Sequence, residues 1–157
     1  MKISLVTPPF DLIKSAYASR SKIKKGYLPP LGMGYLASSL AAAGYNQVKL
    51  FDGASMGIGE KEFVRLVLND SPDLIGVSCM TASSGEAYRL AREIKKLSNA
   101  QIVLGGPHIT DFGKEVLLDE KAVDLAVTGE GEETIVELCN SLKDGKNLLN
   151  IKGLIFR

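Results

Sequence analysis

The sequence alternates short apolar runs with segments of helical periodicity, and this alternation restricts the chain to few folds. Five runs predict β-strands: Lys2–Thr7, Val48–Asp52, Leu74–Ser78, Ile102–Gly105 and Val123–Val127. Most are rich in Val, Ile and Leu on both faces, which is typical of parallel strands covered by helices on both sides. Parallel strands need crossover connections, so we predict an α/β fold with a doubly wound, mainly parallel sheet of five or six strands.

Apolar residues at helical spacing occupy the segments between these runs. The clearest pattern extends from Ala87 to Leu97, and Ser83 with Glu86 predicts a capping box at its start. Four further helices are expected around residues 36–43 with a stop at Gly44, around 63–67, around 135–142 with a stop at Gly145, and, from a weaker pattern, around Lys114–Leu118.

The length of 157 residues fits a single domain, residues 1–157. The last segment, Ile151–Arg157, is an apolar, strand-like run that stops abruptly. Natural domains seldom end on an uncovered apolar strand, so we expect this chain to be a piece of a longer protein.

Charge and cysteine content limit the class of protein. The formal net charge is +1, whereas a protein that follows a nucleic-acid backbone usually carries a clear basic excess. No apolar run approaches the ~18 residues of a membrane span. Cys79 and Cys139 are far apart and form no CxxC motif. We therefore expect a cytoplasmic protein without a nucleic-acid partner and without a membrane span.

The connection Pro8–Pro30 is far longer than the ~2–6 residues usual between a strand and a helix. Its segment Phe10–Tyr27 carries five basic residues against one acidic residue. Long connections in compact domains often serve function. A binding role and a solvated excursion both remain open for this basic loop.

Ligands of doubly wound sheets bind beyond the carboxyl ends of the strands, so the residues that follow each strand are the main candidates for a site. They are Thr7-Pro8-Pro9, Asp52-Gly53-Ala54, Ser78-Cys79-Met80-Thr81, Gly105-Gly106-Pro107-His108 and Thr128-Gly129-Glu130-Gly131. Small residues let a ligand approach the backbone, and hydroxyl groups offer directed hydrogen bonds. This edge is expected to receive a ligand.

A dinucleotide site is one alternative at this edge. Residues Gly32–Ala37 match GxGxxA, and Asp52 follows at a strand end, as in a dinucleotide site. However, the motif lies far from the first predicted strand, and Pro29 or Pro30 more plausibly starts a helix there, in which the glycines allow close packing.

The single histidine, His108, has no second ligand at metal spacing, and no G-x-S-x-G motif accompanies it. It could approach a cofactor or make a structural hydrogen bond. Glu130 and Glu132 could serve acid–base chemistry or stabilise the start of a helix. Neither pattern predicts a catalytic centre or a protein-held metal.

Several motifs occur together and in order: Pro8-Pro9, Pro30–Ala37 (PLGMGYLA), Pro72–Ser78 (PDLIGVS), Gly105–Thr110 (GGPHIT) and Gly129–Glu132 (GEGE). The combination closely resembles the N-terminal cobalamin-binding domain of cobalamin-dependent radical S-adenosylmethionine enzymes, over nearly the whole chain. The resemblance implies a Rossmann-like fold that holds the corrin ring over the carboxyl edge of the sheet, with the nucleotide tail detached from cobalt and inserted into the domain.

The resemblance also implies roles for particular residues. Ser78-Cys79-Met80 matches the SxL element and Gly105-Gly106 the GG element that line the tail in this family. Ala54 stands where related domains with a DxHxxG motif carry the histidine that ligates cobalt, so binding without a histidine lower ligand is implied. The full set of predicted cofactor-binding residues is Asp52, Gly53, Ser78, Met80, Thr81, Gly105, Gly106, Pro107, His108, Thr128, Gly129, Glu130 and Gly131.

The radical chemistry of this family needs a CxxxCxxC motif, because three thiolates hold the iron–sulfur cluster. Two cysteines cannot supply it, so this chain is not expected to be catalytic alone. S-adenosylmethionine and a [4Fe-4S] cluster would belong to a radical domain in cis after Arg157, and methyl transfer is the expected reaction of the whole enzyme. Two alternatives remain: a docking domain that has lost its cofactor, and a nucleotide-binding Rossmann domain.

Overall fold

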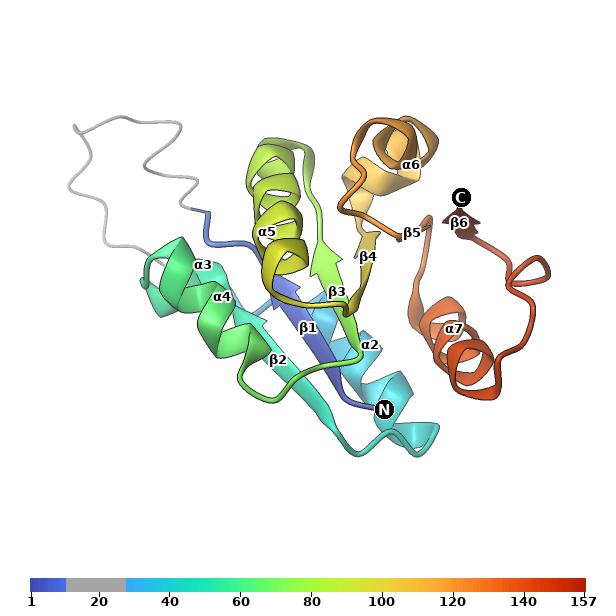
Figure 1. The fold of residues 1–157 in the computed structure, drawn as a ribbon. Coiled ribbons are helices and arrows are strands. Elements are labelled where there is room, and N and C mark those ends of the chain that lie inside the picture. Colours follow the sequence, from blue (N-terminus) through green and yellow to red (C-terminus); the bar gives the residue numbers. More distant parts are fainter. Residues whose placement is uncertain (11–27) are drawn as a thin grey trace.

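The computed structural model describes residues 1–10 and 28–157, which form one six-stranded sheet in the order β2-β1-β3-β4-β5-β6 (Figure 1). The first five strands are parallel, and β6 runs antiparallel to β5. The strands are β1 (Ile3–Thr7), β2 (Val48–Asp52), β3 (Leu74–Ser78), β4 (Gln101–Gly105), β5 (Leu125–Val127) and β6 (Leu154–Phe156).

Helices cover both faces of the sheet, as predicted. One face, here called the packed face, carries α4 (Glu60–Leu68), α5 (Ser84–Leu97) and α6 (Pro107–Asp119). The opposite face, here called the open face, carries α2 (Leu31–Ala42) and α7 (Glu132–Asp144). Two short helices, α3 (Gly53–Met56) and η1 (Thr81–Ser83), follow β2 and β3. The doubly wound α/β fold is therefore confirmed.

Alternate residues of each strand serve the two faces. Ile102 and Leu104 of β4 are buried among the helices of the packed face, whereas Val103 joins the core of the open face. Strands with apolar residues at both sets of positions are stable only between two layers, which explains the continuous apolar runs in the sequence. The edge strand β2 departs from this pattern, because its residues are half-buried or exposed.

Two predictions about helix starts were wrong in detail. Helix α6 begins at Pro107, seven residues before the segment predicted from its apolar spacing, because proline at the first helical position needs no hydrogen-bond acceptor for its nitrogen. Helix α5 begins at Ser84, but Ser83 forms no capping box with Glu86. The hydroxyl of Ser83 instead donates to the carbonyl oxygen of Met80, at 3.4 Å.

The terminal apolar run supplies β6 at one edge of the sheet, and the residues of this strand are half-buried. Within it, β6 pairs with β5, and Leu154 and Phe156 pack into the core of the open face. Ile155 packs against the core of the packed face. The guanidinium of Arg157 donates to the carbonyl oxygens of Val123, at 2.7 Å, and Leu117, which ties β6 to the end of α6.

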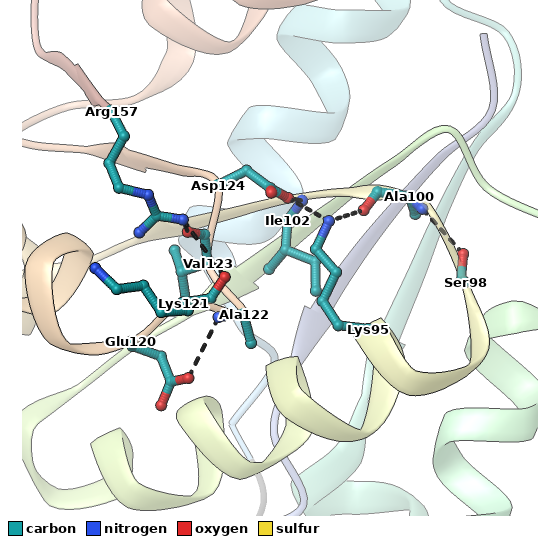
Figure 2. Close-up of polar contacts among 10 residues, drawn as sticks. All are labelled: Lys95, Ser98, Ala100, Ile102, Glu120, Lys121, Ala122, Val123, Asp124 and Arg157. Atoms are coloured by element: carbon teal, nitrogen blue, oxygen red, sulfur yellow. Dashed lines mark hydrogen bonds and ion pairs between the residues drawn. The ribbon is translucent and has the colours of Figure 1, made fainter.

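A polar network closes the amino ends of β4 and β5, opposite the edge where ligands were expected (Figure 2). The carboxylate of Asp124 accepts hydrogen bonds from the Ile102 amide and the Lys95 ammonium, both at 2.7 Å. Lys95 also donates to the carbonyl oxygen of Ala100 at 2.8 Å. These polar groups are hydrogen-bonded to one another, so we interpret this edge of the sheet as structural and not as a ligand site.

The basic loop predicted between β1 and α2 falls largely on residues 11–27, outside the described residues, so its role stays a prediction. No helix in the described part of the chain combines the length and apolar character needed to cross a membrane.

Candidate functional site

A cavity of about 710 Å³ opens at the carboxyl ends of the central strands. The chain order reverses between β1 and β3: the helix after β1 covers the open face, and the helix after β3 covers the packed face. The two connections diverge at this point and leave a crevice, which is where ligands of such sheets bind. The volume falls within the ~300–1,000 Å³ of small-molecule sites.

Two rows of residues from neighbouring strands form the sheet side of the cavity. The outer row lies at the strand ends and comprises Thr7, Asp52, Ser78, Gly105 and Val127. Thr7 donates its hydroxyl to the Asp52 carboxylate at 2.7 Å. Small and polar residues at the strand ends leave space above them and offer hydrogen-bonding groups to a ligand.

The inner row lies two residues further into the sheet and comprises Leu5, Gly76 and Val103, which are paired across β1, β3 and β4. Two strand residues span about 7 Å, so the cavity penetrates well below the strand ends. Ile3 and Leu74, the next pair inward, are fully buried core residues. The inner row is therefore the floor of the cavity.

Helices of the open face supply the opposite wall, through Met33 and Leu36 of α2 and Ile135 of α7. Gly32 also lines the cavity, and a Cβ added there would meet no atom within 4 Å. The same holds for Gly34, so the expectation that these glycines allow close helix packing was wrong. Both lie inside α2, not in a turn after β1, and the dinucleotide fingerprint is not formed.

Nine of the thirteen predicted site residues line this cavity: Asp52, Ser78, Met80, Gly105, Gly106, Pro107, Gly129, Glu130 and Gly131. The other four, Gly53, Thr81, His108 and Thr128, do not line it. Sequence reasoning missed the inner row and the wall from α2 and α7. Gly76, a glycine inside an apolar strand, marks a close approach of the Leu5 side chain, because a Cβ there would lie 2.8 Å from Leu5 Cδ2.

Two glycines of the predicted set are required by the conformation or the close packing of the backbone. Gly106 has φ +106° and ψ −179°, a conformation essentially restricted to glycine, and an added Cβ would lie 2.9 Å from the carbonyl oxygen of Cys79. A Cβ on Gly53 would lie 2.6 Å from backbone atoms of Thr7 and Pro9. Gly105 differs, because a Cβ there would meet only the carbonyl oxygen of Val127, at 3.8 Å, and would otherwise project into open space.

His108 is half-buried, and both of its ring nitrogens have partners. Its Nε2 lies 2.7 Å from the Tyr88 hydroxyl, and its Nδ1 lies 3.3 Å from the Thr81 hydroxyl. Burial raises the pKa of Tyr88 to about 12, so the phenol stays protonated. This geometry matches the structural hydrogen bond considered for His108 from the sequence. Thr128 similarly donates to the carbonyl oxygen of Gly153, at 3.2 Å.

The charged lining of the cavity is acidic. Asp52, Glu130 and Glu132 line it, and the described lining residues include no Lys, Arg or His. A ligand that carries several phosphates would meet like charge here, whereas neutral amide N–H donors would find acceptors.

The two cysteines belong to the cores, one on each side of the sheet. Cys79 is buried on the packed face and Cys139 on the open face, and both are free thiols. Burial raises the pKa of each thiol to about 12, so neither supplies a thiolate near neutral pH. Within residues 1–10 and 28–157, no three His, Cys, Asp or Glu side chains are grouped to hold a metal ion.

The sequence model of the B12-binding domain family matches residues 24–139, most of the chain. The chain belongs to this family. Vitamin B12 is cobalamin, so the predicted cofactor class is confirmed by family membership. The matched region includes α2 and extends into α7, the two helices that form one wall of the cavity.

Curated relatives share about a third of their sequence positions with this domain. An uncharacterized methyltransferase of Pyrococcus horikoshii is 34% identical over 160 residues, with 100% of this chain and 33% of the relative covered. An anaerobic magnesium-protoporphyrin IX monomethyl ester cyclase of Synechocystis is 32% identical, with 100% and 31% covered. The domain thus spans about a third of the length of these relatives.

Solved structures confirm the Rossmann-like fold. The radical S-adenosylmethionine methyltransferase TsrM from Kitasatospora setae, with cobalamin and a [4Fe-4S] cluster bound, superposes with a TM-score of 0.77 at 22% identity. The cobalamin-dependent S-adenosylmethionine radical enzyme OxsB, with aqua-cobalamin and S-adenosylmethionine bound, gives 0.79 at 21% identity. The alignments cover 99% of this chain and 27% and 20% of those chains.

Proposed function

We propose that this B12-binding domain holds the nucleotide tail of cobalamin in the cavity, with the corrin ring at the mouth and without a histidine lower ligand. The observation that carries the proposal is the depth of the cavity, which passes between the sheet and α2 and α7 from the outer row down to the inner row. A compact corrin alone would need only the mouth, whereas an inserted tail needs this depth.

The lining residues fit such a ligand. Gly105 leaves open space beside the tail, and the hydroxyl of Ser78 can bond its polar atoms. At the mouth, Glu130 and the backbone around Gly129 can accept hydrogen bonds from the side-chain amides of the corrin. The carboxylate of Asp52, held by Thr7, offers a further acceptor.

The position of Ala54 supports binding without histidine ligation. Ala54 lines the cavity but has no atom that could bind cobalt. His108 is engaged on both ring nitrogens by Tyr88 and Thr81. No other histidine exists in the chain.

We infer that the domain works within a longer protein that carries a radical S-adenosylmethionine domain in cis, with S-adenosylmethionine and a [4Fe-4S] cluster there. The Pyrococcus horikoshii relative and TsrM are both named as methyltransferases, which supports methyl transfer as the parent reaction. When bound, cobalamin supplies a cobalt centre that can carry a methyl group. A cytoplasmic location remains a prediction from the unpaired cysteines.

The first experiment is a titration of the purified chain with hydroxocobalamin, followed by absorbance and by melting temperature. We expect saturable binding and a higher melting temperature, because a ligand specific for the folded state stabilises it. Gly105→Leu should abolish binding while the fold is retained, since the new side chain enters the cavity. Gly59→Leu is the matched control, because Gly59 is exposed, outside the cavity lining and also open around its Cβ.

Electron paramagnetic resonance of the bound Co(II) form tests the ligation. We expect no nitrogen superhyperfine splitting, because neither a histidine nor the detached tail base would bind cobalt. A clear nitrogen splitting would refute this part of the proposal. A flat titration of a well-folded chain would favour the cofactor-free docking domain, and stabilisation by a nicotinamide dinucleotide alone would favour the nucleotide-binding alternative.

A further inference from the structure

Helix α2 presents an uncharged face to solvent. Its exposed residues, here called the α2 face, are Leu31, Gly34, Tyr35, Ser38, Ala41 and Ala42. The sequence Leu31–Ala42 contains no charged residue. The other four long helices do expose charges, such as Arg65 in α4, Arg92 in α5, Glu115 in α6 and Glu137 in α7. Surface helices usually turn charged residues to water, so α2 is the exception in this domain.

Two large side chains project from the α2 face. Leu31 is 69% exposed and Tyr35 is 63% exposed, although both are mainly apolar. Aromatic side chains are enriched and charged side chains are depleted at the centres of protein–protein interfaces. The α2 face therefore has the character of an interface and not of a solvated surface.

Gly34 is a further sign of a close approach from outside the domain. It lies inside α2, where glycine is the least favourable residue after proline. Its φ is not positive, and a Cβ there would meet no neighbouring atom within 4 Å among the described residues, so the domain itself does not require a glycine. Ser38 and Ala42 follow at four-residue spacing, on the same side of the helix. This row of small residues would let a second helix pack closely against α2, beside Tyr35.

We propose that the α2 face docks an apolar helix from the part of the longer protein that lies outside this domain. The domain covers only 33% and 31% of its two relatives, so most of such a protein would be available as the partner. Leu31 also lines the cavity, so a domain docked on α2 would reach the mouth. The docked helix should be uncharged where it contacts α2, because a charge buried there would have no partner. The proposal rests on the proposed function for the existence of a radical domain in cis.

Hydroxyl-radical footprinting of the full-length protein and of the purified chain tests the docking. Tyr35 should be oxidised readily in the purified chain and should lose most of this labelling in the full-length protein. Leu97 is the internal control, because it is 67% exposed at the end of α5 and should be labelled equally in both proteins. Equal labelling of Tyr35 in both proteins would overturn the proposal.

A pair of glycine variants tests the close approach to α2. Gly34→Leu should not lower the melting temperature of the purified chain, because the new side chain enters open space and favours the helix. In the full-length protein it should restore the labelling of Tyr35, since it blocks the docked helix. Gly85→Leu is the matched control: Gly85 is an exposed glycine inside α5, also without a neighbour within 4 Å of its Cβ, and this variant should leave Tyr35 protected. Continued protection of Tyr35 in Gly34→Leu would refute the close approach.

The outcomes separate the docking from the proposed function. Gly34 does not line the cavity, so Gly34→Leu should bind hydroxocobalamin as tightly as the unchanged chain. If cobalamin binds but Tyr35 is labelled equally in both proteins, the docking is wrong and the cofactor proposal stands. If Tyr35 is protected in the full-length protein but cobalamin does not bind, the reverse holds. Protection of Tyr35 already in the purified chain would refute the docking, and its dependence on protein concentration would identify a second copy as the occupant.

Discussion

The two faces of the sheet are built from the same strands, but they differ in how the strand ends are covered. On the packed face, Ile102 and Leu104 of β4 are fully buried under helices. On the open face of the same strand, Val103 and Gly105 border a cavity of about 710 Å³. The difference shows that a strand can anchor the core and form a binding site at once, because its alternate residues face opposite layers.

The covering helices sharpen this contrast. Helices α2 and α7 contact each other and bury Leu40 and Leu138 against the amino half of the open face, beside Leu74 and Leu125. Toward the carboxyl ends of the strands, the small residues of the outer row do not fill the space between the sheet and these two helices. The cavity is therefore a consequence of residue size on one half of one face.

The largest expected effect concerns Gly106, which touches both regions. Gly106→Ala should lower the free energy of unfolding by about 4 kcal/mol, because backbone strain at a glycine-only conformation adds to a clash with the Cys79 backbone. Gly129→Ala is the control: Gly129 also has positive φ (+71°) but no neighbour within 4 Å of its Cβ, so strain alone should act. Urea unfolding of both variants measures the difference, and equal losses would contradict it.

A pair of leucines compares the packing of the two faces. Leu90→Ala, in the packed core, should cost about 3 kcal/mol, since it leaves a void that the surrounding helices cannot close. Leu5→Ala should cost about 1 kcal/mol less, because Leu5, although fully buried, lies on the lining of the cavity, where water can enter the space that the truncation opens. Chemical denaturation of the two variants checks this order, and a larger loss at Leu5 would show that the cavity is closed in solution.

The two cysteines allow the burial of the two cores, away from the cavity, to be compared. Each thiol has its pKa raised from 9.0 to about 12 by burial, so the unfolded chain loses its proton at lower pH than the folded chain. Stability should be fully present below pH 9 and should fall between pH 9 and 12, with a slope of about 1 kcal/mol per pH unit for each thiol. Cys79→Ala and Cys139→Ala should each remove a similar part of that slope in unfolding measured against pH.

The smallest effects are expected at two tyrosine hydrogen bonds, one on each face. Tyr88 bonds His108 at 2.7 Å on the packed side, and Tyr45 bonds Asn140 at 2.8 Å on the open side. Each Tyr→Phe variant should lose about 1 kcal/mol in thermal or chemical unfolding, the usual net value of one such bond. A loss at Tyr88→Phe well above that at Tyr45→Phe would indicate that the His108 contact organises more than its own bond.

Much of the architecture follows from sequence pattern. The bounds of β2 and β3 were predicted to the residue, because short apolar runs between helical segments have few other solutions. The carboxyl edge was predicted as the ligand edge for a similar reason, since all parallel strands end there. The early start of α6 was missed because Gly113 and polar neighbours weaken the apolar pattern before Lys114, although Pro107 marked it.

The sequence by itself determined the α/β alternation, the order of glycine-rich segments after the strands and the family motifs they compose. Only the tertiary structure decided which of those residues face a common cavity. The depth of the cavity depends on the register that places Leu5, Gly76 and Val103 in one row, and these residues are far apart along the chain. Likewise, Gly105 and Gly106 are adjacent and chemically identical, yet one borders open space and the other the Cys79 backbone. The end of β4 fixes that difference, because Gly105 is the last residue of the strand, whereas Gly106 lies beyond it and turns the chain into α6 with φ +106°.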